Sequence, residues 1–212
     1  MINQGVLITF EGGEGVGKTT QVARLKKRFE AIGKTVVVLR EPGGTVISEQ
    51  IRETVLTVKN TGLMLLTTEV LLFQAARAQI YGELVLPALA EGKIVLMDRS
   101  RDSSVVYQGV VRGFGKKIIE RLNNISTQKT VPNLTLLLDA PVSVGIKRRM
   151  DVGDGNRLDN EKNDFHEGVR AGYLALAAEN HHNRWKVVDA TASIEAVEAE
   201  LWRLISKKLK LT

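Results

Sequence analysis

The chain has 212 residues, of which 43% are hydrophobic and 25% are charged. These ordinary proportions exclude a disordered, collagen-like or purely coiled-coil chain, and the length predicts one domain over residues 1–212. Lysine and arginine exceed aspartate and glutamate by six residues, 30 against 24, which invites an anionic partner. Because the excess is spread over both halves of the chain, a small phosphorylated ligand fits it as well as a polyanion does.

The sequence contains no cysteine, which excludes disulfides, thiolate metal sites and cysteine nucleophiles and fits a reducing compartment. Residues 1–10 lack the pattern of an export signal, and no apolar run approaches the ~18 residues of a membrane span. Aromatic residues make up only 5% of the chain and are not interleaved with a basic stripe. We therefore expect a cytoplasmic protein with neither a membrane nor a nucleic-acid partner.

Short apolar runs alternate with helical patterns along the chain. The runs lie at 6–10, 36–39, 94–97, 134–138 and 186–188. Most of them are continuous rather than alternating, which is typical of strands that helices cover on both faces. The pattern therefore predicts an α/β fold with a five-stranded parallel sheet and helices on both of its faces.

The helical patterns that separate the first runs lie at 18–32, 46–58 and 68–90. Gly33 is expected to end the first of these helices, and Thr45 is the candidate N-cap of the second. Pro87 is expected to kink the long third helix, and Gly92 to end it.

Polar residues follow four of the apolar runs: Glu11, Arg40, Glu41, Asp98, Arg99 and Asp139. Because the carboxyl ends of parallel strands lie along one edge of a sheet, ligands of such folds bind there. This edge is the expected site. For Asp139, a helix-capping role is an equally good interpretation.

A glycine-rich motif joins the first run to the first helix, with the spacing G-x-x-x-x-G-K-T over residues 12–19. In this motif, backbone N–H groups surround phosphate oxygens, the lysine reaches the β and γ phosphates, and the threonine hydroxyl binds Mg²⁺. Thr20 stands where a dinucleotide site would need a third glycine. The expected nucleotide-binding residues are Gly12, Gly13, Glu14, Gly15, Val16, Gly17, Lys18, Thr19 and Thr20.

Several strings, in order, resemble bacterial thymidylate kinase over almost the whole chain. They are FEGGEGVGKTTQ (10–21), LREPGGT (39–45), LLFQAARAQ (71–79), DRSRDSSVVYQG (98–109), VPNLTLLLDAP (131–141), NRLD (156–159) and DFHEGVRAGYLALA (164–177). The resemblance implies a P-loop NTPase fold that transfers the γ-phosphoryl group of ATP to dTMP, with Mg²⁺ and usually as a homodimer.

The resemblance also implies roles for individual residues. Phe73 and Arg77, four residues apart on one helix face, would hold the thymine, although a core ring and a solvated charge are the alternatives. Asp98 would hold the Mg²⁺ shell together with Thr19, and Arg99 would hold the acceptor phosphate. The other residues implied in substrate binding are Glu14, Glu41, Arg52, Ser104, Tyr107 and Gln108.

Residues 147–159, KRRMDVGDGNRLD, are rich in charge and glycine and are expected to form a short lid, with a solvated loop as the alternative. Family members with glycine at the position of Gly15 usually carry lid arginines where residues 150–152 are here Met-Asp-Val. Arg148 is a candidate to stack on adenine. The candidate catalytic residues are therefore Lys18, Arg99, Arg149 and Arg157.

Three other functions stay open at this point. A kinase of another deoxynucleoside monophosphate would differ in only a few base contacts. A nucleotide-binding protein with weak or no catalysis would explain the non-basic stretch at 150–152. Binding of nucleic acid through the basic charge would show as salt-sensitive retention on DNA.

Overall fold

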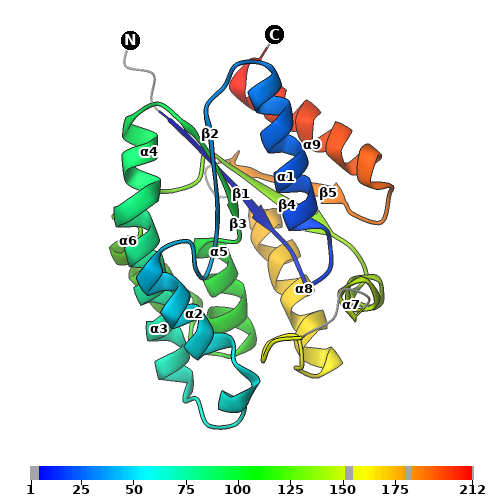
Figure 1. Ribbon diagram of the computed structural model, residues 1–212. Helices are drawn as coiled ribbons and strands as arrows, with labels where there is room; N and C mark the ends of the chain where they lie inside the picture. The colour runs from blue at the N-terminus through cyan, green and yellow to red at the C-terminus, as the bar shows by residue number, and fades with distance from the viewer. Residues whose placement is uncertain (1–4, 151–154, 180–182, 212) are drawn as a thin grey trace.

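The computed structural model describes residues 5–150, 155–179 and 183–211, which build a central sheet with helices on both faces (Figure 1). The strands are β1 (Val6–Glu11), β2 (Val36–Arg40), β3 (Ile94–Asp98), β4 (Leu134–Asp139) and β5 (Trp185–Asp189). Their order is β2-β3-β1-β4-β5, and all neighbours are parallel. The predicted five-stranded parallel sheet is confirmed. Each strand extends one residue past its apolar run, because the polar residue that follows still pairs in the ladder, as Asp98 does with Phe10.

The helices include two π-helical segments and one 3₁₀ turn. They are α1 (Lys18–Ala31), α2 (Val46–Leu56), η1 (Val58–Asn60), α3 (Leu66–Ile80), η2 (Tyr81–Val85), α4 (Leu86–Ala90), α5 (Arg101–Ser104), η3 (Val105–Val111), α6 (Lys116–Ser126), α7 (Val142–Met150), α8 (Asn163–Glu179) and α9 (Ile194–Leu209). The N-cap prediction for Thr45 is confirmed, because its Oγ1 accepts a hydrogen bond from the backbone N–H of Ser48 at 3.2 Å.

The prediction of one long helix over 68–90, kinked at Pro87, is wrong in the position of the irregularity. The segment is divided into α3, the π-helical η2 and α4, and Pro87 lies in the first turn of α4. Proline has no N–H to donate to the preceding turn, so the irregular turn lies just upstream of it rather than at it.

Helices cover both faces of the sheet (Figure 1), and alternate residues of β1 belong to different cores. On one face, Ile8 and Phe10 of β1 pack in a core with α1 and α9. On the other face, Leu7 packs with η2 and α4, and Leu137 of β4 packs in a core with α3, η3, α6 and α8. With both faces covered, the sheet offers its carboxyl edge to ligands. In the described ranges, no helix is long and apolar enough to cross a membrane.

Candidate active site

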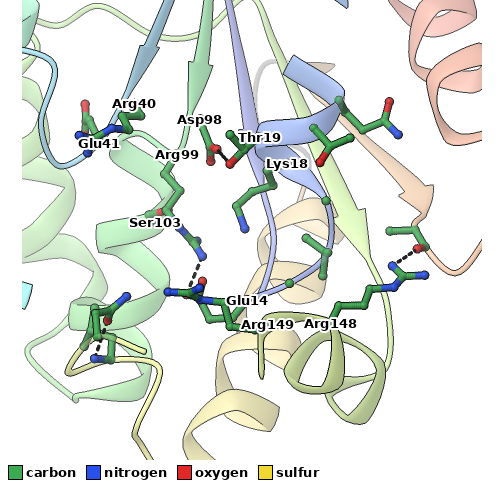
Figure 2. Close-up of a pocket in the computed structure, with 18 of the residues that line it drawn as sticks. Glu14, Lys18, Thr19, Arg40, Glu41, Asp98, Arg99, Ser103, Arg148 and Arg149 are labelled. Carbon is green, nitrogen blue, oxygen red and sulfur yellow. Dashed lines mark hydrogen bonds and ion pairs between the residues drawn. The ribbon is translucent and has the colours of Figure 1, made fainter. Parts of the chain in front are cut away.

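The carboxyl edge of the sheet opens into a cavity of about 920 Å³ (Figure 2). Segments that follow β1, β2, β3 and β5 line it together with α3, η3 and α7. The lining includes these residues predicted from the sequence: Glu14, Gly15, Val16, Gly17, Lys18, Thr19, Thr20, Glu41, Arg52, Phe73, Arg77, Asp98, Arg99, Ser104, Tyr107, Gln108, Arg148 and Arg149. The expected edge of the sheet is therefore the place where most of the predicted residues meet.

The glycine-rich loop turns directly from β1 into α1. Gly17, the N-cap of α1, has φ 92°, a left-handed conformation that favours glycine. Lys18 is buried and its Nζ donates to the backbone oxygens of Gly12 (3.2 Å) and Gly13 (2.6 Å). Burial, reinforced by the nearby Arg99, lowers the pKa of Lys18 to about 8. The loop thus holds a desolvated ammonium on neutral carbonyl groups.

The glycine at position 15 is required by a close approach between the loop and α7. A Cβ on Gly15 would lie 1.9 Å from the carbonyl oxygen of Gly145, and a Cβ on Gly145 would lie 2.3 Å from that of Glu14. Two glycines facing each other therefore bring the backbone of α7 against the loop. This contact sets the position of α7 next to the loop, and with it the backbone position of Arg148 and Arg149 at the end of that helix.

Two oxygen groups meet beside the loop at the end of β3. The hydroxyl of Thr19 donates to Asp98 Oδ2 at 2.6 Å (Figure 2). Among the described residues, no group of three or more His, Cys, Asp or Glu could hold a metal by itself. Mg²⁺ is usually bound through one or two protein oxygens plus substrate phosphates and water, so this pair fits that ion.

Arg99 follows β3 and contacts the glycine-rich loop through Glu14. Its backbone has φ 63°, in the left-handed region, and its Nη2 donates to Glu14 Oε1 at 2.6 Å (Figure 2). Tyr107 donates its hydroxyl to the same oxygen at 2.9 Å. Burial alone would raise the pKa of Glu14, but Arg99 and Lys18 outweigh it and hold that pKa at about 2. Glu14 is therefore a carboxylate throughout the neutral range.

Arg77 is fully buried, which rules out a solvated helix charge. Its Nε donates to Glu41 Oε2 at 2.7 Å, and its Nη1 donates to Ser104 Oγ at 3.0 Å and to Asn123 Oδ1 at 2.8 Å. Phe73, one turn earlier, belongs to the core and also lines the cavity, so the core interpretation is confirmed and its contact with a thymine stays a prediction. The ion pair of Arg77 with Glu41, the hydroxyl of Ser104 and the ring of Phe73 thus form one subsite.

The two remaining polar residues at strand ends do different work. Asp139 receives two hydrogen bonds from Arg170, at 2.8 and 2.9 Å, rather than capping a helix. Glu11 is buried and accepts from Ser103 Oγ (2.6 Å) and Tyr173 Oη (2.8 Å). Burial raises the pKa of Glu11 to about 7, and the nearby charge of Asp102 adds to this.

The three candidate arginines around the expected lid have separate positions. Arg148 donates to the carbonyl oxygen of Ala190 at 2.8 Å, and Arg149 donates to Asp159 Oδ2 at 2.9 Å; both line the cavity (Figure 2). Residues 151–154, the middle of the expected lid, lie outside the described residues.

Arg157 requires a correction. It is buried, and its Nη2 donates to Glu69 Oε2 at 2.6 Å while its Nε donates to the carbonyl of Val55 at 3.0 Å. It is not among the described residues that line the cavity. The expected position next to the transferring phosphate is therefore not found, because a buried carboxylate on α3 holds the guanidinium elsewhere.

Several residues that line the cavity are not among those predicted from the sequence, among them Pro42, Ser103 and residues 190–194. The last segment follows β5, so the rule that located the other strand ends could have found it. Arg52 was predicted and lies in the cavity, where its Nη1 donates to the carbonyl oxygen of Pro42 at 2.8 Å.

Comparisons with known proteins agree with this geometry. A family model described as thymidylate kinase matches residues 10–201. The thymidylate kinase of Geobacter sulfurreducens is 46% identical over 198 residues, covering 91% of this chain and 92% of the relative. That of Latilactobacillus sakei subsp. sakei is 46% identical over 209 residues, covering 96% of this chain and 95% of the relative.

A solved structure shares the fold. The crystal structure of thymidylate kinase from Ehrlichia chaffeensis aligns with a TM-score of 0.77 at 28% identity, covering 95% of this chain and 99% of that one. The predicted P-loop NTPase fold is confirmed by this likeness and by the parallel sheet. With the phosphate loop and the subsite around Arg77 opening into one cavity, these matches show that the chain belongs to the thymidylate kinase family.

Proposed function

We propose that this chain transfers the γ-phosphoryl group of ATP to dTMP, giving dTDP on the way to dTTP, as a single domain over residues 1–212. One observation carries the proposal. In a chain of this family, one cavity contains both the phosphate loop with Lys18 and the buried subsite of Phe73 and Arg77. Donor and acceptor nucleotides can therefore meet with their phosphates in the middle.

The donor end of the cavity is assigned to ATP. The backbone N–H groups of the loop, residues 12–20, surround the phosphates, and Lys18 exchanges its two carbonyl partners for phosphate oxygens. Arg148, held on Ala190 beside the segment after β5, contacts the adenine.

The acceptor end is assigned to dTMP. Phe73 packs on the base, and Arg77, oriented by Glu41 and Ser104, donates to a base carbonyl. Gln108 contributes a further base contact.

The sugar and phosphate of dTMP lie toward the phosphate loop. Glu14 accepts from the sugar hydroxyl, and Tyr107 orients this carboxylate through its own hydrogen bond. Arg99 and Arg52 bind the phosphate, with Glu41 nearby on the same wall of the cavity. This arrangement supports binding of the anionic end of dTMP between two guanidinium groups.

Phosphoryl transfer requires little covalent chemistry from the protein; it requires two anions held in line, water excluded and positive charge along the path. Lys18 and Arg99 supply that charge from the loop side, and Arg149 supplies it from the end of α7. Thr19 and Asp98 are the residues that hold Mg²⁺. When bound, the ion offsets the negative charge of the phosphates and helps to orient them.

The test of this function is a coupled assay of ADP formation with dTMP, dUMP, dGMP, dCMP and AMP as acceptors. We expect dTMP to have the highest kcat/KM. Equal or better turnover of a non-thymine acceptor would replace this proposal with a kinase of another nucleoside monophosphate.

A nucleotide-binding protein with weak catalysis is tested by the arginines. Replacing Arg149 with alanine is expected to lower kcat about 100-fold or more, because it removes a charge next to the transferring group. Arg203→Ala serves as the comparison, since that guanidinium pairs with Glu200 on α9 and is not among the described residues that line the cavity. Binding of both nucleotides with a kcat unchanged by Arg149→Ala would favour the weakly catalytic alternative.

We also propose a cytoplasmic homodimer. Cytoplasmic location is supported by the sequence without cysteine. The dimer is supported by exposed apolar side chains on α2, α3 and α6, helices of which α3 packs against both others. These side chains are Val46, Ile47, Leu71, Ile118 and Ile125. Sedimentation equilibrium tests the dimer, and a monomer at micromolar concentration would refute it.

A further inference from the structure

A buried carboxylate on α3 lies at the back of the acceptor subsite and has no role in the mechanism above. Glu69, one turn before Phe73 on the same helix, is 2% exposed. Its Oε1 accepts from Gln108 Nε2 at 2.9 Å, and its Oε2 accepts from Arg157 Nη2 at 2.6 Å. Each oxygen of this carboxylate therefore has its own partner.

The charge of Glu69 decides which way the amide of Gln108 is turned. A carboxylate can only accept hydrogen bonds, so the atom of Gln108 that faces Glu69 must be the NH₂ group. Arg157, and Arg112, whose Nε lies 3.4 Å from Glu69 Oε1, both form ion pairs with this carboxylate. The opposite orientation of the amide would place two oxygens against each other.

The other end of that amide has no partner. Gln108 is 1% exposed and lines the cavity, and within the described ranges no donor lies in hydrogen-bond distance of its Oε1. An unpaired buried acceptor is costly, so a buried carbonyl oxygen on a cavity wall calls for a donor from a ligand. Gln108 Oε1 is therefore an acceptor available to a ligand, and the contact of Glu69 with the NH₂ group prevents the amide from turning over.

Arg77 can supply a hydrogen-bond donor to the same base whose N3–H would meet the acceptor of Gln108. Ser104, one turn before Gln108, receives Arg77 Nη1 at 3.0 Å, and Arg77 lines the same cavity as Gln108. A thymine presents a carbonyl oxygen next to an N3–H, which matches a donor beside an acceptor. Cytosine presents an amino group next to an unprotonated N3, which opposes both.

We infer that Glu69 is a positioning residue for base selection: by fixing the amide of Gln108, it presents Oε1 to the N3–H of a thymine or uracil and disfavours cytosine. This inference rests on the proposed function and deepens it. It also gives the pair of Glu69 with Arg157 a purpose, because that ion pair holds the carboxylate in place.

The decisive variant is Glu69→Gln. The oxygen of the new amide is expected to stay on Arg157, which lies at 2.6 Å and is nearer than Arg112 at 3.4 Å, so its NH₂ group faces Gln108. Gln108 must then turn its own oxygen toward residue 69 and its NH₂ group toward the cavity. The acceptor for thymine N3–H becomes a donor, which suits cytosine N3 instead.

The measurement is the ratio of kcat/KM for dTMP to kcat/KM for dCMP. In Glu69→Gln we expect this ratio to fall by about 10-fold to 100-fold, because one buried hydrogen bond is lost for thymine and gained for cytosine. Glu161→Gln is the matched control, since Glu161 pairs with the same Arg112 at 2.6 Å but does not contact Gln108. Its ratio should equal that of the native protein.

A second variant covers a failure of Glu69→Gln to fold. Gln108→Leu removes the amide and should lower the same ratio, and adding Glu69→Gln to it should lower the ratio no further. A fall in dTMP and dCMP activity by the same factor in Glu69→Gln, or a native ratio in Gln108→Leu, overturns the inference. Failure of the native protein to phosphorylate dTMP would instead refute the proposed function.

Discussion

The buried ammonium of Lys18 predicts that binding of ATP takes up a proton above neutral pH. Burial and the charge of Arg99 lower the pKa of Lys18 from 10.5 to about 8 in the free protein. The phosphates of ATP favour the charged ammonium, so the pKa rises when the nucleotide binds. Only the cationic form makes this contact, and affinity therefore falls as the pH rises through about 8.

The size of the effect follows from that pKa. About half of the Lys18 side chains are neutral in the free protein at about pH 8, and about nine-tenths at about pH 9. If the bound form stays fully charged, binding takes up about 0.5 proton at the lower pH and about 0.9 at the higher one. The dissociation constant for ATP then rises about fivefold over this interval.

Isothermal titration calorimetry measures this directly, because the heat of binding depends on the ionisation enthalpy of the buffer in proportion to the protons taken up. Two buffers at each of three pH values between 7 and 9 suffice, roughly spanning the titration of Lys18. Lys18→Arg is the control, since a guanidinium keeps its charge over this range. No proton uptake in the native protein at the highest pH, or equal uptake in Lys18→Arg, would refute the reasoning.

Three more predictions concern the surroundings of the loop. Gly145→Ala places a Cβ 2.3 Å from the Glu14 carbonyl oxygen and should raise the KM for ATP about tenfold, whereas Gly168→Ala, with room for a Cβ, should leave it unchanged. Because burial raises the pKa of Glu11 to about 7, the unfolding free energy in urea should fall as the pH rises from 4.5 through about 7; this decline should be absent from Glu11→Gln. Arg148→Ala should raise the KM for ATP in steady-state kinetics and leave that for dTMP unchanged. The reason is that Arg148 lies beside the segment after β5, at the end of the cavity proposed to bind ATP.

The sheet and the edge that bears the site could be predicted because they depend on local pattern. A strand buried on both faces requires a continuous apolar run, and the first polar residue after it marks where the strand leaves the core. Glu41 and Asp98 were located in this way, and both line the cavity. The phosphate loop is equally local, since its glycines, lysine and threonine are contiguous.

The pairing of charges could not be predicted, because it depends on which side chains meet after packing. The sequence shows that Arg157 follows a glycine-rich stretch but not that Glu69, 88 positions earlier, receives it. In the same way, Asp139 was recognised as polar at a strand end, while its partner Arg170 lies on α8. A charge in a sequence has many potential partners, and burial decides among them.

The basic side chains that line the cavity differ in the oxygen atoms to which they already donate. Lys18, Arg52 and Arg148 donate to backbone carbonyl oxygens, which are neutral, so a phosphate or a base can replace these partners without displacing a carboxylate. Arg77 donates to the carboxylate of Glu41, which offsets its charge, as suits the proposed contact with an uncharged thymine.

Arg99 and Arg149 are the intermediate cases. Each donates to a carboxylate, Glu14 or Asp159, but each is also partly exposed to the cavity. A phosphate that binds either arginine must therefore share it with the carboxylate or displace it. The net charge of +6 is thus a poor guide to the ligand, whereas the oxygen that each cation already contacts shows whether a phosphate would have to displace a carboxylate to bind it.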